Sequence, residues 1–571
     1  MSTNENWPAI WTLLVATSLS TAALSSSLAA PSTPSTPEPQ KMDCGGLATL
    51  KIPASSIGEP SSGASVKSAS VSDASDTNGS YCKVLGEIAP VDPTAPVINF
   101  EVNLPVNWNS KAIQMGGSGF NGTLVTGLDN YVNAPAASAT PLKMGFVTLG
   151  SDSGHQSVRN KPFDATFALN DEALLNFGQL SIKKTRDVAV ALIQSHYGKK
   201  ASRFYFIGGS QGGSEAFLAA QRYPADYDGV IAGYPVYNKM LLMAGASSIS
   251  KAMYQNGGIG WVSPQKADML VKAVYAACDA LDGLADGIIA DVHGCQVATK
   301  KFKAKDASNP LRCPGGSDTA GTCLSDPQID ALNQMDSPAS LGFTLYDDVS
   351  EFPKWTPFEG ATFRDFPSPS PLPFMLGLAN KPVGVFTAGM GPVSDEFEYG
   401  PGLAMTRYFI TKDITTDPIN GYRFTDWKDR ILQLEPIINA RDARLTGFQA
   451  RGGKMILYHG RVDELVSPYN SIQYYERVVK ANGQAATDKF LRFFMVPGMG
   501  HLAGPFPAQI DTLAALEKWI EQGIAPEEMI AGDGSAGATA GRTRPVCAYG
   551  KWPKYVGGDA RLATSFACTA S

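Results

Sequence analysis

The chain has 571 residues, a formal net charge of −6 and 44% hydrophobic residues. A disordered chain of this length would have fewer apolar residues and a larger net charge, so the composition indicates a globular protein. The sequence has no run of Lys and Arg, which argues against a nucleic-acid partner. The length predicts roughly two to four domains, or one large domain that carries an insertion.

An apolar stretch with small residues, Ile10–Leu24, lies near the start of the chain, and residues 27–29 (SLA) are typical of a cleavage site. The pattern predicts a secretory signal peptide over residues 1–29. The first ten residues hold no Lys or Arg, which leaves an uncleaved anchor as the alternative. Residues 30–43 predict a Pro/Ser/Thr linker. No later stretch is long and apolar enough to cross a membrane, so we expect a secreted or periplasmic protein without membrane contact after cleavage.

A predicted strand, Lys111–Met115, is followed by the glycine-rich residues 116–119. In hydrolases a loop of this kind after an early strand supplies a backbone N–H to an oxyanion. Gly117 is the expected donor and Ser118 is its neighbour; a plain glycine turn is the alternative. The next predicted strand, Gly145–Leu149, leads to His155, which we expect either to line a site or to be structural.

The residues Gly208-Gly209-Ser210-Gln211-Gly212 stand between a predicted strand (203–207) and a predicted helix (214–222). A G-x-S-x-G sequence in strand–turn–helix context is typical of a nucleophile elbow, where glycines leave room for a strained turn. Ser210 is therefore the predicted nucleophile. The N–H of Gln211 is the predicted second oxyanion donor. The alternative is a glycine-rich turn whose Ser only caps the helix.

Three acidic residues, Asp279, Asp282 and Asp286, occur within CDALDGLADGII. With the carbonyl oxygens of Leu284 and Ile288 they supply the oxygen ligands that Ca²⁺ takes in proteins. The spacing is not that of an EF-hand. A solvated acidic turn is the alternative.

Only three of the five His follow Ser210: His293, His459 and His501. In an α/β-hydrolase the catalytic residues come in the order Ser, Asp or Glu, His. Asp463 follows the predicted strand 454–458, and a predicted helix (468–481) and strand (490–496) separate it from His501. We predict Asp463 as the residue that orients His501, with His501 as general base and acid. His459 as base and Glu464 as orienter remain alternatives, and His293 is expected at the surface.

The eight Cys are even in number and lie in local pairs, and no Cys-x-x-Cys occurs, which argues against zinc. Eight Cys allow 105 connectivities, so the sequence alone does not fix the pairing. Nearest-neighbour pairing is the simplest choice and joins Cys44 to Cys82, Cys278 to Cys295, Cys313 to Cys323, and Cys547 to Cys568.

Together these stretches resemble the tannase and feruloyl esterase family of secreted α/β-hydrolases. The resemblance runs from about Cys44 to Cys568. It is carried jointly by GGSGFNG (116–122), SDSGH (151–155), GGSQGG (208–213), QRYPADYDGVIAGYP (221–235), CDALDGLADGII (278–289), CLSDPQ (323–328), RGGKMILYHGRVDELVSP (451–468) and VPGMGH (496–501).

The resemblance implies an α/β-hydrolase core in two parts, residues 44–237 and 451–571, with a large lid domain, residues 238–450, inserted between them. It implies a structural calcium ion in the 279–288 loop, peripheral disulfides at the four Cys pairs, and no organic cofactor. The catalytic roles that the resemblance implies for Ser210, Asp463 and His501 agree with those predicted above from the sequence motifs and their order.

Two departures from the family pattern stand out. The family usually has a disulfide that joins the residue before the nucleophile to the residue after the catalytic His; here these residues are Gly209 and Leu502. The elbow and the His loop must then be held by packing alone. Ser214 stands where the family often has Arg, which weakens any transfer of substrate preference.

The expected function is hydrolysis of a small aromatic ester, such as a gallic, hydroxycinnamic or terephthalic acid ester, through an acyl-enzyme. The alternatives are a peptidase or lactonase on the same scaffold and a non-catalytic binding protein. In the predicted lid, Arg407 is a candidate partner for a substrate carboxylate or phenol, with a surface role as the alternative. Most aromatic residues of the stretch 352–427 are expected in the lid core, with one or two stacking on the acyl group.

Overall fold

The computed structural model describes residues 41–157, 163–319, 321–346, 349–363, 399–417, 420–501 and 503–570. Lys41–Ser571 form one compact unit, distinct from Met1–Gln40. The predicted signal peptide and most of the predicted linker lie outside the described residues. Among the residues that are described, no helix is long and apolar enough to cross a membrane.

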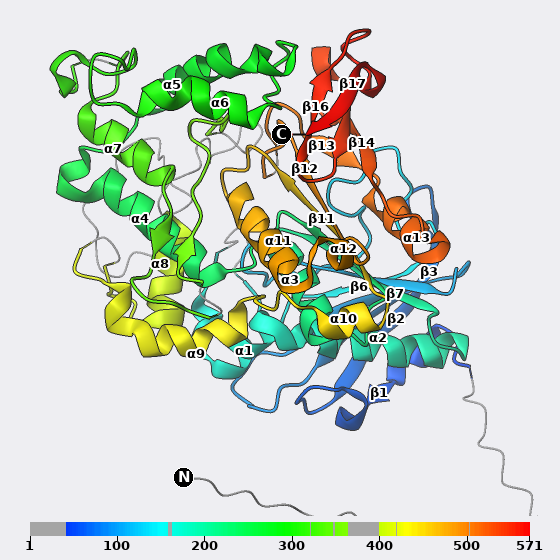
Figure 1. Cartoon of the computed structure of the whole chain (residues 1–571). Helices are drawn as coiled ribbons and strands as arrows, with labels where there is room; N and C mark the ends of the chain where they lie inside the picture. Colours follow the sequence, from blue (N-terminus) through cyan, green and yellow to red (C-terminus); the bar gives the residue numbers. More distant parts are fainter. Residues whose placement is uncertain are drawn as a thin grey trace, which may run out of the picture. The chain divides into compact units, whose positions relative to one another are not determined.

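A ten-stranded sheet forms the centre of the described structure, with the strand order β1-β2-β3-β4-β6-β5-β7-β8-β11-β12 (Figure 1). Strands β6, β5, β7, β8, β11 and β12 pair in parallel, and β1 to β4 form antiparallel pairs that join them through β6. The strands are Lys51–Ile52 (β1), Ala64–Ser75 (β2), Gly79–Ile88 (β3), Ile98–Pro105 (β4), Lys111–Met115 (β5), Val147–Ser151 (β6), Arg203–Gly209 (β7), Gly229–Gly233 (β8), Lys454–Gly460 (β11) and Leu491–Val496 (β12).

The α-helices and the smaller sheets surround this sheet or extend from it. The helices are Asp171–Leu175 (α1), Ser181–Tyr197 (α2), Gln211–Arg222 (α3), Lys239–Gly258 (α4), Pro264–Cys278 (α5), Val292–Thr299 (α6), Asp326–Met335 (α7), Tyr399–Ala404 (α8), Lys428–Ile438 (α9), Thr446–Ala450 (α10), Pro468–Asn482 (α11), Gln484–Thr487 (α12) and Thr512–Gln522 (α13). The remaining strands are Ala339–Ser340 (β9), Glu351–Phe352 (β10), Ala508–Ile510 (β13), Glu528–Asp533 (β14), Thr543–Cys547 (β15), Lys551–Tyr555 (β16) and Phe566–Ala570 (β17).

Most residues of the parallel strands are buried because both faces of the sheet are covered. Successive side chains of a strand point to opposite faces. In β7, Phe204 and Phe206 pack in one core with α2, α3 and α11, whereas Tyr205 and Ile207 pack in a second core with α13. This two-sided burial explains why the strand RFYFI reads as a continuous apolar run.

The stretch between β8 and β11 is mainly helical and has a core of its own. Leu241 of α4, Leu332 of α7 and Ile431 of α9 are completely buried in this third core. Figure 1 shows these helices in green and yellow. We call this stretch, residues 238–450, the insertion. It belongs to the same compact unit as the sheet, and its role as a lid stays a prediction.

The local elements agree with the sequence patterns, with small shifts. The strand predicted at 145–149 is β6, two residues further on, and the helix predicted from Ser214 begins at Gln211. All four nearest-neighbour disulfides are present, between Cys44 and Cys82, Cys278 and Cys295, Cys313 and Cys323, and Cys547 and Cys568. No Cys among the described residues is free.

Candidate active site

Ser210 occupies the sharp turn between β7 and α3. Its φ of 57° and ψ of −120° form a strained conformation that non-glycine residues rarely adopt. Its N–H donates to the carbonyl of Gly233 at 3.0 Å, and its carbonyl accepts from the N–H of Ser214. A Cβ at Gly208 would lie 2.4 Å from the carbonyl carbon of Gly212, so only glycine fits where the chain doubles back. This is the geometry of a nucleophile elbow.

His501 and Asp463 meet in the loops that follow β12 and β11. His501 Nδ1 donates to Asp463 Oδ2 at 2.8 Å, which leaves His501 Nε2 to accept a proton from another group. The other carboxylate oxygen of Asp463 accepts from the N–H groups of Leu465 and Val466, each at 2.9 Å. Burial would by itself raise the pKa of Asp463, but the His501 and His459 rings hold it at about 2. Asp463 is therefore a carboxylate at any pH near neutrality.

His459 is completely buried at the end of β11 and supports Asp463 from the other side. Its Nε2 contacts both Asp463 Oδ2 (3.1 Å) and the carbonyl of Val466 (2.9 Å), and its Nδ1 contacts Ser471 Oγ (2.7 Å). Since the Val466 carbonyl accepts only, Nε2 carries a proton. This arrangement favours the structural interpretation of His459.

Glu464 does not take the orienting role. Its side chain accepts from the Phe363 N–H and the Thr362 hydroxyl of the insertion. Asp463, not its neighbour, holds the histidine.

Ser210 and His501 line the same cavity, which has a volume of about 630 Å³. This size lies within the range of small-molecule sites, roughly 300–1,000 Å³. The walls come from the sheet's loops and from the insertion and are largely apolar. They include Phe120, Tyr131, Phe163, Tyr234, Leu242, Met243, Met405 and Val466.

The predicted oxyanion donors both line this cavity, but one of them is engaged elsewhere. Gln211 is the first residue of α3, so its N–H has no partner within the helix. The N–H of Gly117, in contrast, donates to Glu215 Oε2 at 3.1 Å. In this structure the Gly117 donor is already used, which speaks against its predicted oxyanion role. The next residue, Ser118, also lines the cavity, and the described residues offer its N–H no partner.

Tyr234, at the end of β8, lies between the elbow and His501. Its ring centroid is 4.6 Å from that of His501 in an edge-on contact, and its backbone has a positive φ of 34°. A Cβ at Gly209 would lie 2.8 Å from Tyr234 Oη. The ring thus fills the space beside Gly209, the first of the two positions where the resemblance implies a disulfide. The second position, Leu502, lies outside the described residues.

The remaining predicted site residues lie away from the cavity walls that the structure describes. His155 is buried, stacks on Phe167 at 3.8 Å and contacts the Phe120 carbonyl, which favours its structural interpretation. His293 is exposed on α6, as expected. Arg407 is buried, and its Nε donates to the Thr416 carbonyl, so neither the substrate role nor the surface role is confirmed.

The aromatic residues that the sequence pointed to in the insertion are mostly core residues. Phe352, Trp355 and Phe409 are buried in the insertion's core, and Phe374 lies outside the described residues. The rings on the described cavity walls come from other stretches of the chain, among them Phe120 and Tyr234.

The acidic loop predicted to bind calcium turns through Gly283 and Gly287, with φ values of 99° and 82°. Within the loop, Asp279 accepts from the N–H of Gly287, and Asp282 accepts from the N–H groups of Leu284 and Ala290. Burial, with smaller contributions from the neighbouring carboxylates, raises the pKa of Asp282 to about 7.

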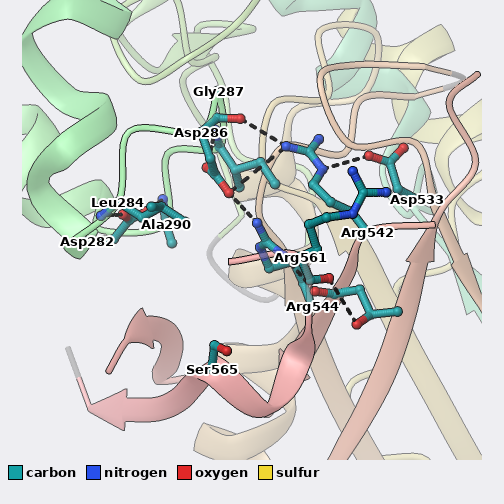
Figure 2. Close-up of polar contacts among 12 residues, drawn as sticks. Asp282, Leu284, Asp286, Gly287, Ala290, Asp533, Arg542, Arg544, Arg561 and Ser565 are labelled. Atoms are coloured by element: carbon teal, nitrogen blue, oxygen red, sulfur yellow. Dashed lines mark hydrogen bonds and ion pairs between the residues drawn. The ribbon is translucent and has the colours of Figure 1, made fainter. Parts of the chain in front are cut away.

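Asp286, the third acid of this loop, faces the C-terminal strands. Figure 2 shows it turned toward Arg542 and Arg544, and its Oδ2 is paired with Arg544. Arg542 also joins the carbonyl of Asp286 to Asp533 of β14. These contacts fasten the insertion to the C-terminal sheet.

The loop contains the kinds of oxygen atom that bind calcium, but these atoms are not arranged around a common point in this structure. The carbonyl oxygens of Leu284 and Ile288 accept no hydrogen bond from any described residue, so they are available to coordinate a cation. Within the described part of the chain, however, no three acidic, His or Cys side chains converge closely enough to hold an ion. Binding would have to draw the carboxylates of Asp279, Asp282 and Asp286 together.

A mixed sheet with a nucleophile elbow after β7, an acid after β11 and a His after β12 defines an α/β-hydrolase, and the class of its activity is carboxylic ester hydrolysis. The comparisons place the chain more narrowly. A family model described as "Tannase and feruloyl esterase" matches residues 82–569, and the chain belongs to this family.

Two relatives and one solved structure support the assignment. An uncharacterized esterase of Agrobacterium fabrum is 36% identical over 542 residues, which cover 92% of each chain. A mono(2-hydroxyethyl) terephthalate hydrolase of Piscinibacter sakaiensis is 33% identical over 86% of this chain and 85% of its own. A crystal structure of an esterase from Aspergillus oryzae, 23% identical, superposes with a TM-score of 0.69 over 92% of this chain and all of its own, which confirms the fold.

Proposed function

We propose that the protein is a secreted serine esterase that cleaves esters of aromatic acids through an acyl-enzyme on Ser210. One observation carries the proposal: a strained Ser and a His bound to a buried carboxylate line the same cavity. Four disulfides support an oxidising compartment. Rings on the cavity wall and the names of the relatives support an aromatic acid as the acyl part.

In the proposed reaction the Ser210 hydroxyl attacks the ester carbonyl while His501 Nε2 takes its proton. Asp463 keeps the Nδ1 proton on the ring and stabilises the imidazolium that forms. The N–H groups of Gln211 and Ser118 stabilise the oxyanion, each contributing about 3–4 kcal/mol in comparable enzymes. His501 then protonates the leaving alcohol and activates a water molecule that releases the acid.

The acidic loop adds a structural proposal. We infer that Asp279, Asp282 and Asp286, with the carbonyl oxygens of Leu284 and Ile288, hold a Ca²⁺ ion away from the cavity. The oxygen set supports this inference, and the ion takes no part in the chemistry above.

A matched set of substrates tests the function: methyl gallate, methyl ferulate, mono(2-hydroxyethyl) terephthalate and p-nitrophenyl acetate, each beside the amide of the same acid. We expect turnover of at least one aromatic-acid ester, no comparable turnover of its amide, and no turnover by the folded Ser210→Ala variant. Faster amide cleavage would make the protein a peptidase. An inert wild-type enzyme that a fluorophosphonate does not label would favour a binding protein.

A further inference from the structure

Two charged side chains behind the oxyanion loop take no part in the chemistry proposed above. Glu215 lies on α3, one turn after Gln211, and Lys239 is the first residue of α4 in the insertion. Both are about 5% exposed. Charged groups are rarely buried without partners, so each must be compensated by its surroundings.

Glu215 is the centre of a hydrogen-bond network that reaches the oxyanion loop, residues 116–121. Its Oε2 accepts from the N–H of Gly117 at 3.1 Å. Its Oε1 accepts from the side-chain amides of Asn121 and Gln211. All three partners present N–H donors, which is the environment of an ionised carboxylate.

The oxyanion loop is clamped onto α3 by this network and by close backbone packing. The Gly117 carbonyl accepts from the N–H of Gly212 at 3.0 Å. A Cβ at Gly116 would lie 2.5 Å from the Gly212 Cα and 2.8 Å from Glu215 Oε2, so the two segments touch directly. Ser118 follows the clamped residues, and its N–H therefore depends on the position of Glu215.

Lys239 supplies a buried positive charge that interacts electrostatically with Glu215. Its Nζ donates to Ser214 Oγ at 2.7 Å and to the carbonyl of Ile438 at 3.1 Å, and it lines the active-site cavity. Ser214 directly precedes Glu215 in the sequence, and its Oγ accepts from the Lys239 ammonium. Burial lowers the pKa of Lys239 to about 8, and the charge of Glu215 opposes that shift.

A second, very small cavity lies on the far side of the oxyanion loop. It has a volume of about 10 Å³ and is lined by polar residues that include Glu215, Gln114, Ser151 and Ser181. This is the size and polarity at which one buried water molecule fits. The Glu215 carboxylate thus lies in a polar pocket behind the loop, whereas Lys239 faces the substrate side.

We propose that Glu215 and Lys239 form a charge-balanced positioning pair that holds the Ser118 N–H in place for the oxyanion. The proposal rests on the esterase function proposed above. Neither side chain touches the reacting atoms. The pair acts through the loop: Glu215 fixes Gly117 and Asn121. Burial raises the pKa of Glu215, and the hydrogen bonds from the loop, with the charge of Lys239, oppose that shift.

The test compares Glu215→Gln, Lys239→Met and the double variant in steady-state kinetics with p-nitrophenyl acetate. Loss of one oxyanion donor lowers kcat by about 10²–10³ in comparable enzymes. We expect Glu215→Gln to lower kcat about 10- to 100-fold with KM changed less than threefold. Binding of phenylboronic acid, which forms a tetrahedral anion on the serine, should weaken by a similar factor. The double variant should lose no more than the worse single variant, because removing both charges leaves nothing unbalanced.

Glu101→Gln is the matched control, because Glu101 is also a buried carboxylate paired with a lysine but lies on β4, outside the described cavity walls. Its kcat should match the wild type. A wild-type kcat in folded Glu215→Gln overturns the pair, as does a Lys239→Met variant with raised KM and unchanged kcat, which would make Lys239 a substrate-binding residue. Should Glu215→Gln fail to fold, the kcat of Lys239→Met and its affinity for phenylboronic acid test the proposal instead. An inactive, unlabelled wild type would instead overturn the esterase function itself.

Discussion

Replacing Asp463 with Asn tests how His501 is held. The carboxylate is completely buried and accepts from His501, His459 and the N–H groups of Leu465 and Val466. An Asn of the same shape has one acceptor oxygen and one NH₂ group, so at least one of these donors faces another donor. An unsatisfied buried donor costs about 1–3 kcal/mol.

The charge of Asp463 adds to this cost. Its pKa of about 2, against an ordinary 3.8, corresponds to roughly 2 kcal/mol. Because the folded-state pKa is lowered, this stabilisation is present above about pH 4 and is lost as the pH falls through about 2. At pH 7 the Asp463→Asn variant should therefore lose about 3–5 kcal/mol of unfolding free energy.

Asp463→Asn should also lower kcat strongly, even at temperatures where the variant is folded. Without the carboxylate the Nδ1 proton of His501 is no longer fixed, and the corresponding change in serine proteases lowers kcat about 10⁴-fold. We expect a loss of 10³–10⁴ here, about 4–5.5 kcal/mol in the barrier. The assay is ester turnover at a temperature where urea titration shows the variant to be folded.

Glu464→Gln is the control for this variant. Glu464 is equally buried and adjacent in sequence, and its carboxylate accepts from Phe363 and Thr362, whereas Asp463 accepts from His501. It should lose stability and keep kcat within about threefold. A folded Asp463→Asn variant with more than a tenth of wild-type kcat would refute the assignment, and so would an equal loss in Glu464→Gln.

Three further predictions concern the surroundings of the site. Tyr234→Ala should lower kcat about tenfold because it removes the ring against His501, whereas Tyr234→Phe should keep most of the activity; equal losses would show that the hydroxyl matters, not the packing. Burial lowers the pKa of His155 to about 4, so unfolding should take up a proton between pH 6.5 and 4; in urea titrations between pH 8 and 5 the wild type should lose about 2 kcal/mol more stability than His155→Gln. Elemental analysis should find about one calcium per chain, and EDTA should lower Tm in the wild type but not in Asp282→Ala; a metal-free protein with unchanged Tm would contradict the calcium site.

The sequence was sufficient for the elements whose signals are local. β5, the β7–α3 elbow and the segment from β11 to β12 were predicted from apolar runs, glycines and spacing, because these signals lie within a few residues of one another. Nearest-neighbour pairing also predicted the four disulfides, each of which joins Cys residues at most 38 positions apart, although spacing alone did not exclude other pairings.

The parts that the sequence did not reveal depend on contacts between distant segments. Gly117 looked like a free donor, and only its contact with Glu215, 98 positions away, shows that its N–H is used. Tyr234 and Lys239 carry no motif, and their roles come from the place where β8 and α4 meet the elbow. Of these residues, Glu215 alone could have been noticed in the sequence, because it is an acidic residue in the first turns of the helix after the nucleophile.

The most direct test of the central claim is the mass of the covalent intermediate. The protein is incubated with a fluorophosphonate or a slow aromatic ester, quenched in acid, digested and analysed by peptide mass spectrometry. We predict one adduct per chain, on Ser210, formed at a rate that Asp463→Asn slows and that Ser210→Ala abolishes. An adduct on another residue, or equal labelling of folded Ser210→Ala, would contradict the account.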